Sequence, residues 1–211
     1  KGYDCFNSVH DLPEAPDAVF LAVPASVAVG IIDELAKMGA GGIVCYTAGF
    51  AEAGQADAQK ALIDAAGDMA LIGPNCYGMI NYLDKVALWP FTHGGKCPGF
   101  GAAIITQSGM LSSDLTMSQR SMPFTHMISA GNQAVLQLED FVDVLCEREE
   151  VHAIGMHIEG LHDVQKFIDA AYKALKHNTP LVVLKTGTSQ VGAQLTVSHT
   201  GSLSGANELY H

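Results

Sequence analysis

The sequence predicts an α/β protein of two doubly wound, parallel-sheet domains. Apolar runs of strand length alternate with segments of helical period along its 211 residues. A hydrophobic content of 48% and 22 glycines are typical of a packed α/β protein with many tight turns. The alternation stops once, between Asn81 and Gly101, where prolines, glycines and a tryptophan gather. We therefore expect one domain over residues 1–93 and a second over 94–211.

The first domain begins with Asp17–Val23, an almost continuous apolar run that is typical of a strand buried on both faces. Ser26 is suited to cap the helix that follows, and Gly39 is suited to end it. The cycle repeats with a strand over 42–47, a helix over 55–66 and a strand over 69–72, closed by a Gly/Pro turn over 73–78. This βαβαβ order is Rossmann-like and requires right-handed crossovers.

The second domain repeats the alternation in a flavodoxin-like order. We expect strands over 102–106, 125–129, 153–158 and 181–185, and helices over 111–120, 138–149 and 164–176. His157 lies inside one of these strands and is expected to be a packing or interface residue. Cys76, in the turn after the third strand of the first domain, is expected to be a small buried thiol.

Composition excludes several functions. The formal net charge is −11 with only 11 Lys and Arg, so we expect no nucleic-acid partner. No apolar run reaches the length of a membrane span, so we expect no membrane partner. The five scattered cysteines, without a CxxC pair, favour a reduced cytoplasmic protein and no metal site. The chain begins with Lys1 and stops soon after its strongest motif, so we expect a fragment of a longer polypeptide.

Three features fall at the carboxyl ends of strands in the second domain, where ligands collect in open parallel sheets. Gln107-Ser108-Gly109 leads into a helix, whose amino end can hold an anion. Glu159 ends a buried strand, and His199 lies in a loop of small and hydroxyl residues. A carboxylate that fixes the imidazole tautomer would suit a phosphorylated histidine. Taken alone, each has a plainer reading: a helix cap, a solvated acid and a solvated histidine.

In the first domain, the loops over 23–25, 46–50 and 73–78 would border a nucleotide-sized groove. The chain contains neither a GxGxxG after a strand nor a GxxxxGK[ST] motif. A phosphate-binding loop between a first strand and a first helix is therefore missing, or lies upstream of Lys1.

The ordered motifs resemble those of NDP-forming acyl-CoA synthetases, relatives of the succinyl-CoA synthetase alpha subunit. The resemblance spans essentially the whole chain and implies a partial CoA-binding domain followed by a ligase-like flavodoxin domain. The motifs that carry it are Val23-Pro24-Ala25, Ala48-Gly49-Phe50-Ala51-Glu52, Gly73-Pro74-Asn75-Cys76-Tyr77-Gly78, Gln107-Ser108-Gly109, Ile158-Glu159-Gly160, Lys185-Thr186-Gly187 and Ser198-His199-Thr200-Gly201.

The resemblance also implies roles for residues. His199 corresponds to the phosphohistidine and Glu159 to the acid that orients it. Two departures are that Thr188 replaces a common arginine and Val135 a common aspartate. The implied phosphate-binding residues are Gln107, Ser108 and Gly109, and the implied CoA-binding residues are Pro24, Tyr46, Thr47, Ala48 and Asn75.

The function so implied is an acid–thiol ligase that forms acyl-CoA from a carboxylic acid, CoA and a Mg-bound nucleoside triphosphate, with release of phosphate. The triphosphate would be handled by an ATP-grasp domain or subunit that this chain does not contain, and we expect an oligomer. The alternative is a CoA-sensing regulatory region fused to a protein acetyltransferase, which would need neither His199 nor Glu159. A third reading, an NAD-binding domain, lacks the glycine fingerprint.

Overall fold

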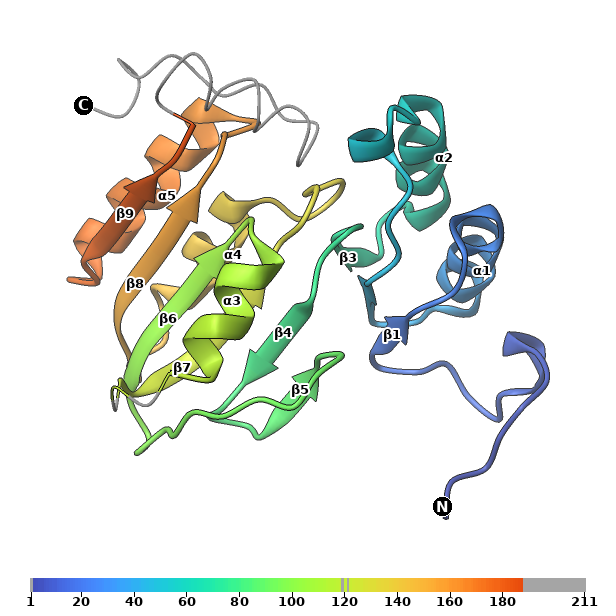
Figure 1. The fold of residues 1–211 in the computed structure, drawn as a ribbon, viewed down its shortest axis with the longest axis horizontal. Coiled ribbons are helices and arrows are strands. Elements are labelled where there is room, and N and C mark those ends of the chain that lie inside the picture. Colours follow the sequence, from blue (N-terminus) through green and yellow to red (C-terminus); the bar gives the residue numbers. More distant parts are fainter. Residues whose placement is uncertain (1, 119, 121, 188–211) are drawn as a thin grey trace.

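Two sheets form from the alternating elements, and Figure 1 shows them side by side. This computed structural model describes residues 2–118, 120 and 122–187. The first part of the chain makes a three-stranded sheet with order β1-β2-β3, and the rest makes a six-stranded sheet with order β5-β4-β7-β6-β8-β9. The expected α/β class with two sheets is confirmed.

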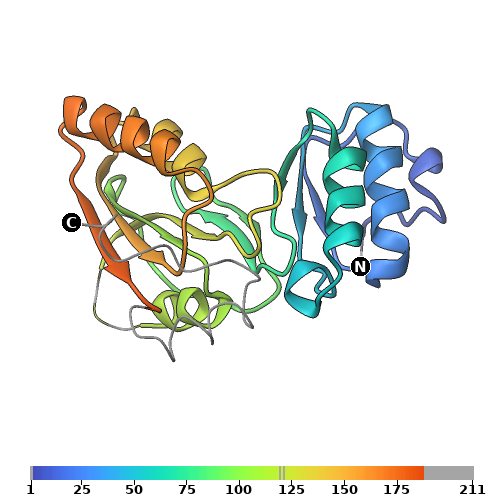
Figure 2. The ribbon, with the colours of Figure 1, turned by 90° about the horizontal axis from the view of Figure 1, so that it is seen from above.

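The smaller sheet contains β1 (Val19–Leu21), β2 (Gly42–Cys45) and β3 (Ala70–Ile72), joined by α1 (Ala25–Met38) and α2 (Ala56–Ala66). All its strands are parallel. Both crossovers advance in the same direction, so right-handed connections place both helices on one face (Figure 2). Among the described residues this unit is therefore wound on one side, not on both as expected.

Local sequence signals predict the carboxyl end of α1 correctly but not its amino end. Gly39 ends the helix as predicted, with a left-handed φ of 85° that a residue without Cβ adopts at little cost. The predicted cap is wrong, because Pro24 is the N-cap residue and Ser26 already lies in the first turn. Two short 3₁₀ helices also belong to this unit: η1 (Val9–Asp11) precedes β1, and η2 (Ala51–Ala53) lies between β2 and α2.

The two faces of the smaller sheet pack against different partners. One face meets α1 and α2 through a core that includes Ile32, Leu62 and Leu71. The other face presents Val44 and Ile72 to side chains of the larger unit, Met79, Leu88, Leu136 and Phe141 among them. Burial on both faces explains why these strands read as continuous apolar runs.

In the larger sheet, β6, β7, β8 and β9 are parallel to one another, as predicted. Figure 2 shows α3 on one face of this sheet and α4 and α5 on the other, so this unit is doubly wound. The elements are β4 (Gly78–Asn81), β5 (Val86–Leu88), β6 (Gly101–Thr106), α3 (Gly109–Thr116), β7 (Phe124–Ser129), α4 (Leu138–Leu145), β8 (Val151–Ile158), α5 (Val164–Lys176) and β9 (Leu181–Lys185).

The hairpin of β4 and β5 was not predicted. It pairs antiparallel, and β4 joins the larger sheet through β7. The expected division between residues 93 and 94 therefore does not coincide with the division between the sheets. The reason is the turn that ends at Gly78. Gly78 has a φ of +97°, and the close Leu88 carbonyl leaves no room for a side chain at this position. That turn carries the chain out of the first sheet before the Pro/Gly stretch begins.

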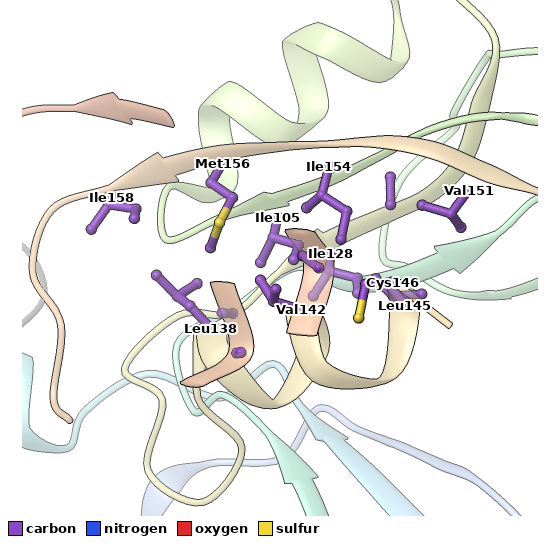
Figure 3. Close-up of a cluster of buried hydrophobic side chains, with 14 residues drawn as sticks. Ile105, Ile128, Leu138, Val142, Leu145, Cys146, Val151, Ile154, Met156 and Ile158 are labelled. Atoms are coloured by element: carbon purple, nitrogen blue, oxygen red, sulfur yellow. The ribbon is translucent and has the colours of Figure 1, made fainter. Parts of the chain in front are cut away.

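The core of the larger unit lies between the sheet and helices α4 and α5 (Figure 3). Ile105, Ile128, Ile154 and Met156 point from the strands toward Leu138 and Val142 of α4. The predicted helices over 111–120 and 138–149 are shorter than expected, because α3 ends at Thr116 and α4 at Leu145. No helix in the described part of the chain is long and apolar enough to cross a membrane.

Candidate functional site

The order of the strands reverses between β6 and β8. From β6 the chain crosses to β7 on one side, and it later adds β8 and β9 on the other side. In open α/β sheets, ligands bind at the carboxyl ends of the strands at such a reversal. The residues there are Gln107 and Ser108 after β6 and Glu159 and Gly160 after β8. We call these four residues the strand-end group.

Gln107 is 2% exposed, and its side chain reaches from the end of β6 to the end of β8. Its Oε1 accepts hydrogen bonds from the amides of Glu159 and Gly160, and its Nε2 donates to the Gly160 carbonyl at 2.8 Å. The side chain therefore joins the two strand ends and fixes the backbone that carries Glu159. Oε1 and one N–H of Nε2 are engaged in these bonds, and the role of Gln107 in binding phosphate stays a prediction.

Ser108 is the N-cap residue of α3, as its plainer reading predicts. Its Oγ accepts from the Leu111 amide, and its own amide donates to Thr106 Oγ1 at 2.9 Å. The first amides of a helix lack partners within the helix and carry partial positive charge. Gly109 begins α3, and its lack of a side chain leaves room for the Tyr77 ring.

His157 is more than a packing residue. Its Nδ1 lies 3.3 Å from Thr106 Oγ1, and its Nε2 lies 3.2 Å from Thr186 Oγ1. The imidazole thus connects the ends of three adjacent strands, β6, β8 and β9. Sequence reasoning missed this role, although the polar side chain within an apolar strand was a signal.

Lys185 adds a cationic group to the same edge. It ends β9 and pairs in register with Ile158, the residue before Glu159. Burial lowers the pKa of Lys185, while the charge of Glu159 acts in the opposite direction. The edge therefore contains a helix amino end, a buried acid and a nearby lysine. His199, the predicted phosphohistidine, lies outside the described residues, so its pairing with Glu159 stays a prediction.

A second feature lies at the carboxyl ends of the smaller sheet. A cavity of about 370 Å³ is lined there by Ala22, Val23, Tyr46, Thr47, Ala48, Asn75, Cys76 and Tyr77, and we call it the Tyr46–Tyr77 cavity. Four of the five predicted CoA-binding residues line it: Tyr46, Thr47, Ala48 and Asn75. Pro24 does not line it and instead precedes the first turn of α1. Cys76 is buried, as expected.

Hydrogen bonds hold the walls of this cavity in place. Thr47 Oγ1 donates to the Val23 carbonyl at 2.7 Å, and the backbone N–H of Asn75 donates to the Thr47 carbonyl at 2.9 Å. Asn75 itself has a left-handed φ of 55°, a conformation that asparagine tolerates better than most residues. The three loops that sequence reasoning placed around one groove are thus bonded to one another.

Asn132, from the loop after β7, connects the two units. Its Nδ2 donates to Gln59 Oε1 at 3.0 Å and to Glu52 Oε2, and its Oδ1 accepts from Asn75 Nδ2 at 3.3 Å. Glu52 in turn accepts from the amides of Gly49 and Phe50. Burial would raise the pKa of Glu52, but these hydrogen bonds to its charged form outweigh burial and lower the pKa. Sequence reasoning gave Asn132 no role.

Tyr77 lies between the Tyr46–Tyr77 cavity and the start of α3. Its ring lines the cavity, and the same ring packs on Gly109, where an added Cβ would lie 3.0 Å from Tyr77 Cε1. The Tyr77 amide also donates to Ser129 Oγ at 3.1 Å, at the carboxyl end of β7. One side chain therefore lies between the Tyr46–Tyr77 cavity of the first unit and the amino end of α3 in the second.

This arrangement agrees with the family models that match the chain. Residues 100–211 match the model described as succinyl-CoA ligase like flavodoxin domain, and residues 1–82 match a CoA binding domain. The chain belongs to the succinyl-CoA ligase-like flavodoxin family. The resemblance to NDP-forming acyl-CoA synthetases is thereby confirmed.

Relatives of this ligase-like chain match nearly all of it. The acetate–CoA ligase [ADP-forming] I of Archaeoglobus fulgidus is 36% identical over 99% of the chain and 31% of its own length. A trans-feruloyl-CoA synthase from an unknown prokaryotic organism is 33% identical over 97% of the chain and 30% of its own length. Subunit alpha of acetate–CoA ligase [ADP-forming] II from Pyrococcus furiosus is 33% identical, over 100% of the chain and 46% of that subunit.

Solved structures share this fold. The dinucleotide forming acetyl-coenzyme A synthetase 1 of Ca. Korarchaeum cryptofilum, in complex with phosphate and ADP, superposes with a TM-score of 0.86. It is 29% identical, and the match covers 99% of this chain and 46% of that one. The ligase-like chain thus spans between about a third and a half of the proteins that it matches.

Proposed function

We propose that this chain is the CoA-binding and phosphoryl-transfer part of an NDP-forming acid–CoA ligase. The observation that supports this most directly is the position of Tyr77, between the Tyr46–Tyr77 cavity and the start of α3. The thiol of a CoA bound in the cavity and a phosphoryl group held at the start of α3 would both lie next to the Tyr77 ring. Residues 1–93 would then supply the CoA site and residues 94–211 the phosphoryl site.

The proposed reaction has three balanced steps. A nucleoside triphosphate transfers its terminal phosphoryl group to His199 and leaves as the diphosphate. The phosphoryl group then passes from His199 to the carboxylate of the acid, which gives an acyl phosphate and regenerates the histidine. The thiol of CoA attacks the acyl carbon, loses its proton and displaces inorganic phosphate, which leaves the acyl-CoA. Each step exchanges bonds of similar energy, so the protein acts chiefly by positioning and charge.

The described residues have definite tasks in this scheme. Glu159 would orient His199 and stabilise positive charge on its ring, as a carboxylate does beside an imidazole. Gln107 would hold Glu159 through the backbone, which is a positioning role. The Ser108 hydroxyl and the Gly109 amide, at the start of α3, would hold the phosphoryl oxygens. Tyr46, Thr47, Ala48 and Asn75 would line the site of CoA.

The scheme also requires a partner. An ATP-grasp domain or subunit would bind the Mg-bound triphosphate, either in the same polypeptide or as a separate chain in an oligomer. We place the protein in the cytoplasm, because all five cysteines are free and three of them are buried.

The experiment uses the complete polypeptide together with its ATP-grasp domain or subunit. Incubation with γ-labelled ATP or GTP and Mg²⁺ should give an acid-labile, base-stable phosphoryl adduct on His199. His199→Asn should abolish the adduct and acyl-CoA formation but retain CoA binding, whereas His177→Asn, at the exposed end of α5, should change neither. Glu159→Gln should slow phosphorylation by about 10²–10⁴-fold.

Two results would contradict the proposal. One is full ligase activity in His199→Asn or a phosphate that maps to another residue. The other is CoA binding by the complete protein without any adduct, which would favour the alternative of a CoA-sensing regulatory region.

A further inference from the structure

We propose that His157 is a positioning residue, which as its neutral Nδ1–H tautomer sets the place of the phosphoryl group relative to the segment that leads to His199. This inference rests on the proposed function and adds a residue to the same site. His157 lies on β8, two residues before Glu159. Its two ring nitrogens face the hydroxyls of Thr106, at the end of β6, and Thr186, just after β9.

The ring of His157 lies on the same face of the larger sheet as α3. Met156 and Ile158, its neighbours along β8, belong to the core under α4 and α5. Successive side chains of a strand point to opposite faces, and α3 covers the face opposite to those two helices (Figure 2). The half-buried imidazole thus shares a face with the helix whose amino end would hold the phosphoryl oxygens.

A short chain of hydrogen bonds joins this imidazole to the start of α3. His157 Nδ1 lies 3.3 Å from Thr106 Oγ1, and Thr106 is fully buried. The same hydroxyl accepts from the Ser108 backbone N–H at 2.9 Å and donates to the Ser108 carbonyl at 3.2 Å. Because Ser108 is the N-cap residue of α3, the ring holds the first residue of the proposed phosphate site through one intervening hydroxyl.

The other ring nitrogen reaches the next strand. His157 Nε2 lies 3.2 Å from Thr186 Oγ1, and the Thr186 backbone N–H donates to the Ile158 carbonyl at 3.0 Å. Thr186 is therefore held through both its side chain and its backbone, and the sequence continues from it toward His199. One ring thus connects the amino end of α3 with the segment that leads to the proposed phosphohistidine.

The tautomer follows from the protons at Thr106. A hydroxyl has one proton and two lone pairs. The Thr106 proton goes to the Ser108 carbonyl and one lone pair accepts the Ser108 N–H, so the bond to the ring needs a proton on Nδ1 of His157. In a neutral ring Nε2 then accepts, and Thr186 Oγ1 donates to it. The reverse tautomer would take the Thr106 proton away from the Ser108 carbonyl.

The experiment uses the complete polypeptide with its ATP-grasp partner, and inorganic phosphate is the probe. His157→Phe keeps a planar ring without its hydrogen bonds, and Thr106→Val removes the hydroxyl with little change of shape. Each should weaken phosphate binding about 10-fold by calorimetry, which needs no turnover, and slow phosphorylation of His199 about 10–100-fold. CoA affinity should not change, because the Tyr46–Tyr77 cavity lies in the other unit. A general loss of folded protein would instead reduce the binding of both ligands.

Two conservative variants test the tautomer. The amide nitrogen of asparagine can replace Nδ1 of a histidine, and that of glutamine can replace Nε2. His157→Asn should therefore keep phosphate affinity within about 3-fold of the wild type, whereas His157→Gln should lose as much as His157→Phe. Because His157 and Thr106 act through one chain of bonds, Thr106→Val should add less than about 2-fold to the loss in His157→Phe.

The far end of the chain and the control complete the design. Thr186→Val should leave phosphate affinity unchanged and slow only the phosphorylation of His199, by about 10-fold. His152→Phe is the matched control, because His152 lies on the same strand but is exposed at its amino end, where it stacks on Phe100. It should change neither quantity.

The outcomes separate this inference from the proposed function. Unchanged phosphate affinity in His157→Phe, additive losses with Thr106→Val, or equal losses in His157→Asn and His157→Gln would overturn the inference. A wild-type protein that binds phosphate but forms no adduct on His199 would refute the proposed function, while the effect of His157→Phe on phosphate affinity would still decide whether His157 positions the start of α3.

Discussion

The side chain of Gln107 and the backbone of Gly160 form a reciprocal pair of hydrogen bonds. Gln107 Nε2 donates to the Gly160 carbonyl at 2.8 Å, and the Gly160 amide donates to Gln107 Oε1 at 3.1 Å. The last paired residues of β6 and β8 are Thr106 and His157, so the glutamine amide continues the ladder beyond the point where the strands separate. It thereby fixes the backbone at Glu159 without using the Glu159 side chain.

Replacement of this amide should be costly. Gln107→Leu leaves the Gly160 amide and carbonyl and the Glu159 amide without their partner in a buried place. We expect unfolding free energy to fall by about 2–4 kcal/mol, since each buried unsatisfied group costs about 1–3 kcal/mol and some will find water. Urea denaturation measures the change. The control is Gln165→Leu, which removes an exposed side-chain contact with Asp169 and should cost less than about 0.5 kcal/mol; equal losses in both variants would refute the role of Gln107.

Gly131 should tolerate no side chain. It has a φ of +60°, and an added Cβ would lie 2.3 Å from the Pro74 carbonyl oxygen and 2.6 Å from that of Asn75. Gly131→Ala should therefore lower the unfolding free energy by about 2–3 kcal/mol through overpacking and backbone strain. Gly30→Ala is the control, because Gly30 lies within α1 with nothing near its Cβ position and should gain about 0.5–1 kcal/mol. Thermal unfolding of both variants measures the change in stability. A Gly131→Ala variant as stable as the wild type would disprove the close approach of the two units.

Glu139 should destabilise the fold at neutral pH. It is 1% exposed, and neither carboxylate oxygen has a hydrogen-bond partner in the described part of the chain. Burial raises its pKa, and the charge of Lys166 offsets only part of this effect. A raised carboxyl pKa means that stability is fully present below the unfolded pKa of about 4.3 and is lost as pH rises through the folded pKa.

Glu139→Gln should therefore stabilise the protein by about 1–2 kcal/mol at pH 7, where the carboxylate would otherwise be buried and charged. The gain should shrink at pH 4, where the wild-type side chain is mostly protonated in both states. Urea denaturation at the two pH values checks this. Glu149→Gln, at an exposed position, should leave stability unchanged at both; a gain at Glu139 that does not depend on pH would contradict the explanation.

Asn132 and Glu52 should be energetically coupled across the two units. A double-mutant cycle with Asn132→Ala and Glu52→Gln should give about 1–2 kcal/mol of coupling at pH 7, the range for a hydrogen bond to a charged group. The pKa of Glu52 is lowered in the folded state, so its contribution is present above the unfolded pKa and is lost as pH falls through the folded pKa. The same cycle on the exposed pair Asp33 and Lys37 should give less than about 0.5 kcal/mol. Coupling no larger than in that pair would show that Asn132 does not connect the units.

Much of the architecture follows from local patterns. Apolar runs placed β1, β2, β3, β6, β7, β8 and β9 to within two residues at most of their ends, because a strand buried on both faces must be apolar along its length. The strand-end rule also predicted that Gln107 and Glu159 lie at one edge, since carboxyl ends of neighbouring parallel strands share an edge. The order of motifs likewise indicated the family and four residues that line the Tyr46–Tyr77 cavity.

The sequence by itself thus determined most of the helices and strands, the α/β class and the loops that form the site, because these depend on the period and spacing of nearby residues. Tertiary structure alone decided which sheet takes the β4–β5 hairpin, that Asn132 holds Glu52 from 80 residues away, and that Tyr77 lies between the cavity and Gly109. These contacts join residues far apart in the chain. Their physical basis is the packing of one unit on the other, which no local pattern of hydrophobicity encodes.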